Sequence, residues 1–449
     1  MARFLLACYP IAGHRTPNIA VGHDLAARGH DVAIYSGSLA RPSVEQAGFE
    51  FIPYAEEVDE RITDILLARD EASFAGSVSM KRASALDFRK TSAVMSDWFL
   101  STVPQQVSDL QVAIDRWHPD VLVTDISLFG PILILKELVS IPVAVFCVLI
   151  ACPLPGPDAP TWGRGLPAPR NRRTRLRSTV ERLAQDRVLA RFRADANQLR
   201  ADYGLAPLDE TVTAYSGKTP LYMVASAPEL DYNRQDLPPS VQYVGPCLWH
   251  GAGQQDVPDW LAALAARQRP VIHVTEGTVH LRKPVVLGAA AQGLGGMNAD
   301  VIMTTGQQRD PESLELGPLA DNIRVESFVS HGALFPHTDV VITTGGAGTV
   351  LTALTFGVPL IVVPTGWDLP ESAQRVAECG AGVRIDPKNC TAESLRAAVE
   401  LLLNDPSYRE NARRVGAALA RQGGPARAAE LLERLAPAQS LTDIDELSY

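Results

Sequence analysis

Short apolar runs alternate with longer amphipathic segments along the chain, which is the pattern of repeated β-α-β units. In the first half, runs typical of buried strands occupy residues 4–9, 31–35, 48–52, 119–125, 142–150 and 221–225. Segments with helical spacing lie between several of these runs, at residues 16–28, 93–117, 133–139 and 175–204. The first half is therefore predicted to form a doubly wound parallel α/β domain.

The same alternation starts again near residue 270. Predicted strands cover residues 270–274, 299–304, 323–327, 340–343, 359–364 and 383–385. Predicted helices lie at residues 258–267, 280–293, 331–335, 349–356, 391–404 and 406–421, and a loop is expected after residue 364. A proline-rich segment at residues 236–246 predicts a hinge. We therefore predict two Rossmann-like domains facing across a cleft, residues 1–235 and 251–437, with a linker at 236–250 and a flexible acidic tail at 438–449.

The first half has a turn at residues 10–14, directly after its first strand. Thr16 and Pro17 suit the N-cap and the first position of the following helix, so His14 is expected in the turn itself. Because ligands of open α/β sheets bind at the carboxyl ends of the strands, this turn is a candidate site.

A glycine-rich turn follows the strand at residues 340–343 in the second half. Gly345, Gly346 and Gly348 allow the backbone to approach a ligand closely, before a helix predicted from Thr349. The start of a helix offers unpaired N–H groups and a positive dipole end, which suit a phosphate. The spacing matches neither the dinucleotide fingerprint nor a Walker loop, and a plain crossover that needs small residues is the structural alternative. The two turns together predict one site built by both halves.

Composition and charge narrow the function classes. The chain has 449 residues, of which 46% are hydrophobic and 20% charged, as in a globular protein of about two domains. Its net charge of −10 argues against a nucleic-acid partner. One arginine-rich segment, residues 164–193, is best explained as a solvated helix face, with contact to an anionic ligand or a membrane surface as the alternative.

The cysteines and the two apolar runs at residues 1–8 and 139–152 suggest a cytoplasmic protein. The six cysteines include no C-x-x-C pair, so reduced thiols are expected, and no His, Cys or Asp spacing predicts a metal site. The apolar start of the chain is short and is better explained as a strand than as a signal peptide. Residues 139–152 are apolar but too few to span a membrane, so no stable membrane insertion is expected.

Two long stretches carry a resemblance to a known family. They are PIAGHRTPNIAVGHDLAARGHDV at residues 10–32 and the stretch from FVSHGALFPHTDVVITTGGAGTV to ECGAGVRI at residues 328–385. The chain resembles the nucleotide-sugar-dependent glycosyltransferases of the two-Rossmann GT-B fold, and in particular bacterial enzymes that glycosylate macrolides and other polyketide-type natural products. The resemblance extends over nearly the whole chain.

The resemblance assigns catalytic roles in the first half. A histidine after the first strand is the general base on the acceptor hydroxyl in such enzymes, and His14 stands at that position. The reaction is expected to invert the anomeric centre. A carboxylate must orient the histidine and stabilise its charged form. Asp125 matches the position of this partner, and Asp97 and Asp109 are weaker alternatives.

The resemblance also assigns donor-binding roles in the second half. Residues 328–331, including Val329 and His331, are expected to face the nucleotide base, with Val329 binding through its backbone. Asp368 is expected to bind sugar hydroxyls. The diphosphate is expected to contact the residues of the glycine turn and of one facing loop, namely Thr344, Gly345, Gly346, Gly348, Thr349 and Thr278. Neither a metal nor another cofactor is expected, because N–H groups and the helix dipole would neutralise the phosphates.

Several residues depart from the family pattern. Thr344 stands where the family usually has a histidine, and its hydroxyl is a shorter, uncharged donor. Leu369 replaces the usual glutamine and cannot bond a sugar hydroxyl, which suits a deoxysugar donor. Ser372 replaces an asparagine, and Glu276 would repel a diphosphate unless it points away.

We therefore expect an inverting glycosyltransferase that moves a sugar from a TDP- or UDP-linked donor to a hydroxyl of a small hydrophobic natural product. The alternative is a non-catalytic homologue that assists a partner glycosyltransferase, and a weaker alternative is a nucleotide-sugar epimerase. The acceptor is expected to contact residues 56–88 and 152–204, which are the least regular parts. A homodimer is possible.

Overall fold

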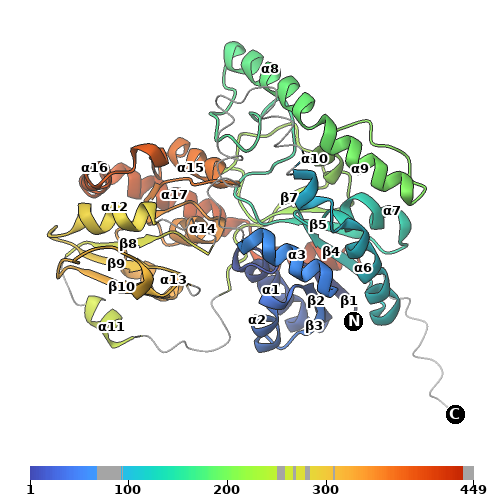
Figure 1. Ribbon diagram of the computed structural model, residues 1–449, viewed down its shortest axis with the longest axis horizontal. Coiled ribbons are helices and arrows are strands. Elements are labelled where there is room, and N and C mark those ends of the chain that lie inside the picture. The colour runs from blue at the N-terminus through green and yellow to red at the C-terminus, as the bar shows by residue number, and fades with distance from the viewer. Residues whose placement is uncertain are drawn as a thin grey trace.

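Two parallel sheets stand side by side in the protein, each covered by helices on both faces (Figure 1). The computed structural model describes residues 1–67, 93, 95–249, 258–265, 269–278, 284–306 and 309–437. Within these residues, the strands form a seven-stranded sheet of order β3-β2-β1-β4-β5-β6-β7 and a six-stranded sheet of order β10-β9-β8-β11-β12-β13. The predicted fold of two doubly wound Rossmann-like units is therefore confirmed.

The first sheet and its helices make up the first lobe. Its strands are β1 (Arg3–Ala7), β2 (Asp31–Ser36), β3 (Glu50–Pro53), β4 (Val121–Asp125), β5 (Val143–Cys147), β6 (Tyr222–Val224) and β7 (Val241–Tyr243). Its α-helices are α1 (Ala12–Ala27), α2 (Arg41–Gln46), α3 (Glu56–Leu67), α6 (Val103–Trp117), α7 (Lys136–Leu138), α8 (Arg172–Val188), α9 (Ala190–Asp202) and α10 (Val212–Ser216). A π-helical turn, Pro131–Leu135, precedes α7.

The second lobe repeats this plan. Its strands are β8 (Val271–Thr275), β9 (Asp300–Thr304), β10 (Ile323–Glu326), β11 (Val340–Thr343), β12 (Leu360–Val362) and β13 (Gly382–Arg384). Its α-helices are α11 (Asp259–Ala265), α12 (Val285–Leu294), α13 (His331–Leu334), α14 (Ala347–Thr355), α15 (Leu369–Glu378), α16 (Ala392–Asn404) and α17 (Pro406–Arg421). A last helix, α18 (Pro425–Glu433), follows.

Apolar strands explain why each sheet lies in the middle of its lobe. The residues Phe4, Leu5 and Leu6 of β1 are at most 1% exposed, and alternate residues enter two separate apolar clusters on the two faces. The second sheet is likewise buried on both faces. Strands covered on both faces need near-continuous apolar sequence, which is the pattern found in the chain.

The strand orders fix where ligands can bind. In the first sheet the order reverses between β1 and β4, and in the second it reverses between β8 and β11. At such a switch point the chain leaves neighbouring strands toward opposite faces, so a crevice opens at their carboxyl ends. Both sequence-predicted turns follow a strand at one of these switch points.

Four elements differ from the sequence-based expectations. α1 begins at Ala12, with Ile11 as its N-cap, so the expected N-cap at Thr16 is wrong and Pro17 lies inside the helix. α14 begins at Ala347 rather than at Thr349. The expected loop after residue 364 contains α15, and the expected linker at 236–250 contains β7. The expected acidic tail lies outside the described residues, as do residues 68–88 of one expected acceptor segment.

The last helix crosses back to the first lobe. The buried side chains of α18 belong to the same apolar cluster as β1 and α1, and they are Ala428, Ala429, Leu431 and Leu432. At its end Glu433 accepts hydrogen bonds from Arg28 at 3.1 Å and from His30 at 2.9 Å. The apolar core of the first lobe is therefore completed by α18.

Candidate active site

The first switch point brings His14 and Asp125 into direct contact. His14 lies in the first turn of α1, which follows β1, and Asp125 is the last residue of β4. His14 Nδ1 is 2.7 Å from Asp125 Oδ2. The other carboxylate oxygen, Oδ1, accepts the backbone N–H of Ser127 at 2.7 Å. Asp125 is fully buried, whereas 16% of the His14 side chain is exposed, so part of the imidazole is accessible from outside.

Electrostatics make His14 a better proton acceptor than a free histidine. Burial alone would lower the pKa of His14, but the charge and hydrogen bond of Asp125 and the charge of Asp368 together raise it. Conversely, burial raises the pKa of Asp368, and His14 acts against this. Because Asp368 belongs to the second lobe, the two lobes share one electrostatic site.

The other two carboxylates considered from the sequence have different partners. Asp97 is exposed and pairs with Arg61. Asp109 accepts hydrogen bonds from the Tyr35 hydroxyl at 2.9 Å and from the Ala55 backbone N–H at 2.8 Å. Among the three candidates, the structure therefore brings only Asp125 to His14.

At the second switch point, a glycine turn leads from β11 into α14. Gly345 has a φ of +106°, and a Cβ there would lie 2.8 Å from Val362, so the position requires glycine. Gly346 is the N-cap of α14, and Gly348 and Thr349 lie in its first turn. Added Cβ atoms at Gly346 and Gly348 would meet nothing within 4 Å. The turn therefore presents accessible N–H groups at a helix start, a geometry suited to an anion.

Thr344 and Glu276 have structural partners that their sequence positions do not reveal. The Thr344 hydroxyl donates to the Glu276 carbonyl at 3.1 Å, so its proton ties the loop after β11 to the loop after β8. The Glu276 carboxylate accepts the Val286 N–H at 2.8 Å and pairs with Arg309 at 2.8 Å. The Glu276 carboxylate therefore does not point toward a diphosphate at the glycine turn. Its buried charge is balanced by the start of α12 and by Arg309. Thr278 is exposed at the end of the loop after β8.

The segment between β10 and α13 carries one exposed aromatic residue. Val329 is 6% exposed, so its side chain belongs to the core while the segment's Phe328 is 49% exposed. His331 opens α13 and stacks on Phe335 with ring centres 4.5 Å apart and an interplanar angle of 13°. An exposed aromatic ring beside a helix start can stack against a planar base.

The first turn of α15 contacts the first lobe. The sequence predicted a loop here instead of a helix. Asp368 is its N-cap position but its carboxylate does not cap the helix, and the half-buried Leu369 is the first helical residue. Trp367 has an unusual positive φ of 52°. Its ring lies 4.6 Å from that of Trp98, which is in the first lobe. The Phe99 ring meets the Trp367 ring edge to face, with 6.5 Å between the ring centres.

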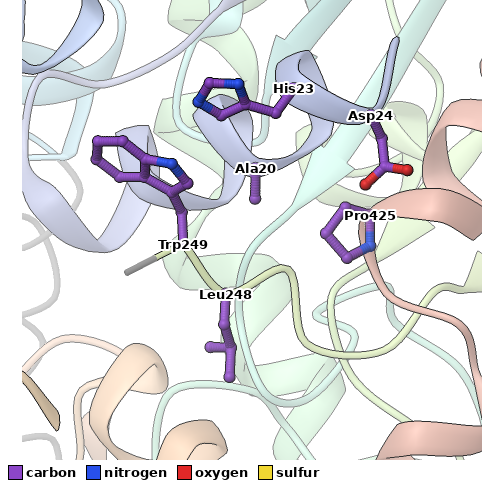
Figure 2. A pocket seen from close by; sticks show the side chains of 6 residues that line it. All are labelled: Ala20, His23, Asp24, Leu248, Trp249 and Pro425. Atoms are coloured by element: carbon purple, nitrogen blue, oxygen red, sulfur yellow. The ribbon is translucent and has the colours of Figure 1, made fainter. Parts of the chain in front are cut away.

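A shallow hollow of about 320 Å³ lies toward the other end of α1 and is distinct from this site (Figure 2). Its lining comes from α1, the linker and α18, and consists of Ala20, His23, Asp24, Leu248, Trp249 and Pro425. The described residues contain no group of three or more His, Cys, Asp or Glu side chains placed to hold a metal ion. They also contain no helix long and apolar enough to cross a membrane.

Comparison with known proteins connects this geometry to named relatives. Residues 289–435 match the family model described as the C-terminal domain of erythromycin biosynthesis protein CIII-like proteins. The chain is 34% identical to 4'-demethylrebeccamycin synthase of Lentzea aerocolonigenes, over 97% of this chain and 99% of the relative. It is 27% identical to demethyllactenocin mycarosyltransferase of Streptomyces fradiae, over 97% of this chain and 87% of the relative.

Solved structures share the fold. The glycosyltransferase of kitacinnamycin superposes with a TM-score of 0.72 at 23% identity, covering 97% of this chain and 99% of that one. The glycosyltransferase VinC, solved in complex with dTDP, gives a TM-score of 0.69 at 22% identity, with the same coverage of both chains. These likenesses establish the two-lobed architecture.

Proposed function

We propose that this chain, which belongs to the natural-product glycosyltransferases of the GT-B fold, is an inverting enzyme that transfers a sugar from a nucleoside diphosphate to a hydroxyl of a small hydrophobic acceptor. That it is a glycosyltransferase follows from its relatives. The finer assignment rests on one observation: His14 Nδ1 lies 2.7 Å from the buried Asp125 carboxylate, and the charge of Asp368 in the second lobe helps to raise the pKa of this histidine.

His14 acts as the general base. Asp125 Oδ2 accepts the Nδ1–H, which leaves the lone pair of Nε2 for the proton of the acceptor hydroxyl. The acceptor oxygen attacks the anomeric carbon as the bond from that carbon to the diphosphate breaks. Attack and departure occur on opposite faces, so the configuration inverts. Asp125 stabilises the imidazolium that forms.

The second lobe holds the donor. The N–H groups of Gly346 and Gly348 and the Thr349 hydroxyl bind the diphosphate at the start of α14, together with Thr278. The Gly345 N–H instead donates to the Thr343 hydroxyl at 3.2 Å, so Gly345 contributes the shape of the turn. Thr344 supports this turn through Glu276 instead of donating to the phosphate. We propose that no metal is required, because these neutral donors and the helix dipole stabilise the leaving charge.

The sugar and the acceptor meet at the first turn of α15. Asp368 binds sugar hydroxyls, and Leu369 favours a donor that lacks a hydroxyl at its position, such as a TDP-deoxysugar. Trp98, Phe99 and Trp367 form an aromatic surface between the lobes, which suits a flat or hydrophobic acceptor.

The first test separates nucleotide binding from transfer. Calorimetry with dTDP and UDP should show saturable binding of at least one, and a deoxysugar donor linked to that nucleotide then gives transfer to 4-methylumbelliferone. His14→Ala should lower transfer by about 10²- to 10⁴-fold, because it removes the base, and leave nucleotide affinity within about twofold. His23→Ala, on the same helix but in the hollow, is the matched control. Failure to bind either nucleotide would favour a non-catalytic auxiliary protein instead.

A further inference from the structure

α15 is bound along one face by a loop of the first lobe, here called the bridging loop (residues 163–170). Glu371 and Glu378 are seven residues apart on α15, so they project from one face two turns apart. Glu371 Oε1 accepts the backbone N–H groups of Gly163 and Gly165, both at 2.8 Å. Glu378 Oε1 accepts the Ala168 N–H at 2.9 Å. Both glutamates therefore bind backbone N–H groups of the bridging loop, and Glu378 Oε2 also pairs with the Arg170 side chain at 3.3 Å.

The bridging loop approaches α15 as closely as a backbone can. Gly165 has a φ of +56°, and a Cβ there would lie 2.1 Å from the Pro370 carbonyl oxygen. Arg384 donates to the Gly165 carbonyl at 2.6 Å from the second-lobe side. Only glycine fits this position, so the contact is built into the sequence of both lobes.

Glu371 is the more buried of the two glutamates and has the denser set of partners. It is 2% exposed, and its second oxygen accepts the hydroxyl of Tyr232, which is equally buried. The guanidinium of Arg375 lies 3.7 Å from the centre of the Tyr232 ring. Removal of this carboxylate would leave the buried Gly165 N–H and the buried Tyr232 hydroxyl without their acceptor, which is costly.

Glu371 also stands next to the proposed chemistry. It is in the first turn of α15, three residues after Asp368, and its N–H donates to the Asp368 carbonyl at 2.9 Å. Asp368 in turn raises the pKa of His14. The hydrogen bonds that hold Glu371 to the first lobe therefore also restrain Asp368, which lies one helical turn away.

We propose that Glu371 is a positioning residue for transfer, which binds the bridging loop and so fixes Asp368 opposite His14. The inference rests on the proposed function of this site. In physical terms, Glu371 sets the separation between the group that holds the sugar and the group that deprotonates the acceptor. Small errors in that separation are costly, because transfer requires the acceptor oxygen and the anomeric carbon in near-attack geometry.

The test follows the titration of His14 in the full chain, because this reports the placement of Asp368 without requiring turnover. Protein with ¹³C-labelled histidine is titrated by NMR, and the His14 signal is assigned with His14→Ala. Glu371→Leu should lower the His14 midpoint and reduce kcat for transfer to 4-methylumbelliferone by about tenfold or more. Affinity for dTDP or UDP should stay at the wild-type value.

Three further variants make the outcome decisive. Glu371→Gln should keep the wild-type midpoint, because its amide oxygen still accepts both glycine N–H groups. Gly165→Ala forces the loop away from the other side and should reproduce Glu371→Leu, which keeps the test informative if the leucine variant fails to fold. Glu378→Leu, on the same helix face but about three turns from Asp368, should change the midpoint least.

Two results would overturn the proposal. One is an unchanged His14 midpoint in both Glu371→Leu and Gly165→Ala, and the other is an equal shift in Glu378→Leu. A wild-type protein that transfers nothing to the probe would count against the proposed function, while the titration would still decide the role of Glu371.

Discussion

The two oxygens of Asp125 have different partners, and this difference determines which nitrogen of His14 carries the proton. Oδ1 accepts from Ser127 N–H and Oδ2 faces His14 Nδ1. In Asp125→Asn the amide oxygen would stay with Ser127, so the NH₂ group would face Nδ1 and force the proton onto Nε2. We expect kcat to fall by about 10²- to 10⁴-fold, because the base is then blocked.

The pH profile provides the second measurement for this variant. The base must be neutral, so the rate rises with pH through the His14 pKa, which lies above the ordinary value of about 6.5 because of Asp125 and Asp368. Asp125→Asn removes a charge that raises the pKa of His14. The rise of the residual rate with pH should therefore occur at lower pH than in the wild type. Asp97→Asn, a carboxylate on the surface, is the control and should leave kcat/KM and its limb unchanged. A shift toward higher pH in Asp125→Asn would contradict the assignment.

Helices were predicted well from the sequence where the residues that start or stop the helix lie in the helix itself. The helices predicted at residues 391–404 and 406–421 were confirmed as α16 and α17, because their signals act on their own helix. The start of α1 was placed four residues late, because Pro17 is tolerated inside the helix. α15 was taken for a loop although it has Pro370 and Glu371 in its first turn, because the motif around it resembles a binding loop.

The turn between β11 and α14 allows a prediction about a single element. Gly345→Ala should lower the free energy of unfolding by about 1–3 kcal/mol, because alanine is strained at a φ of +106° and its Cβ would clash with Val362. Gly346→Ala is the matched control: its φ is −56° and its Cβ would meet nothing within 4 Å, so a change within about 0.5 kcal/mol is expected. Denaturant unfolding of the two variants measures the difference, and equal losses would show that the turn is not held in this conformation.

Most contacts between distant parts of the chain could not be predicted from the sequence. The pairing of His14 with Asp125 was within reach, because parallel strands around a switch point bring their carboxyl ends together. The sequence did not predict that α18 returns to the first lobe. It also did not predict the hydrogen bonds of Glu371 to Gly163 and Gly165. No periodicity marks a carboxylate whose partners are backbone N–H groups 206 to 208 residues away.

A site shared by two lobes should respond to a charge change in either lobe. Asp368→Asn alters only the second lobe, yet it should lower the pKa of His14, because it removes one of the charges that favour the imidazolium. The ¹³C-histidine titration of the free protein measures this shift directly, and the acidic limb of kcat/KM should move to lower pH with it. Asp386→Asn, an exposed carboxylate of the same lobe, should leave the midpoint where it is. An unchanged midpoint in Asp368→Asn would mean that the lobes are farther apart in solution than the structure has them, and that closure onto the substrates, rather than the resting arrangement, assembles the site.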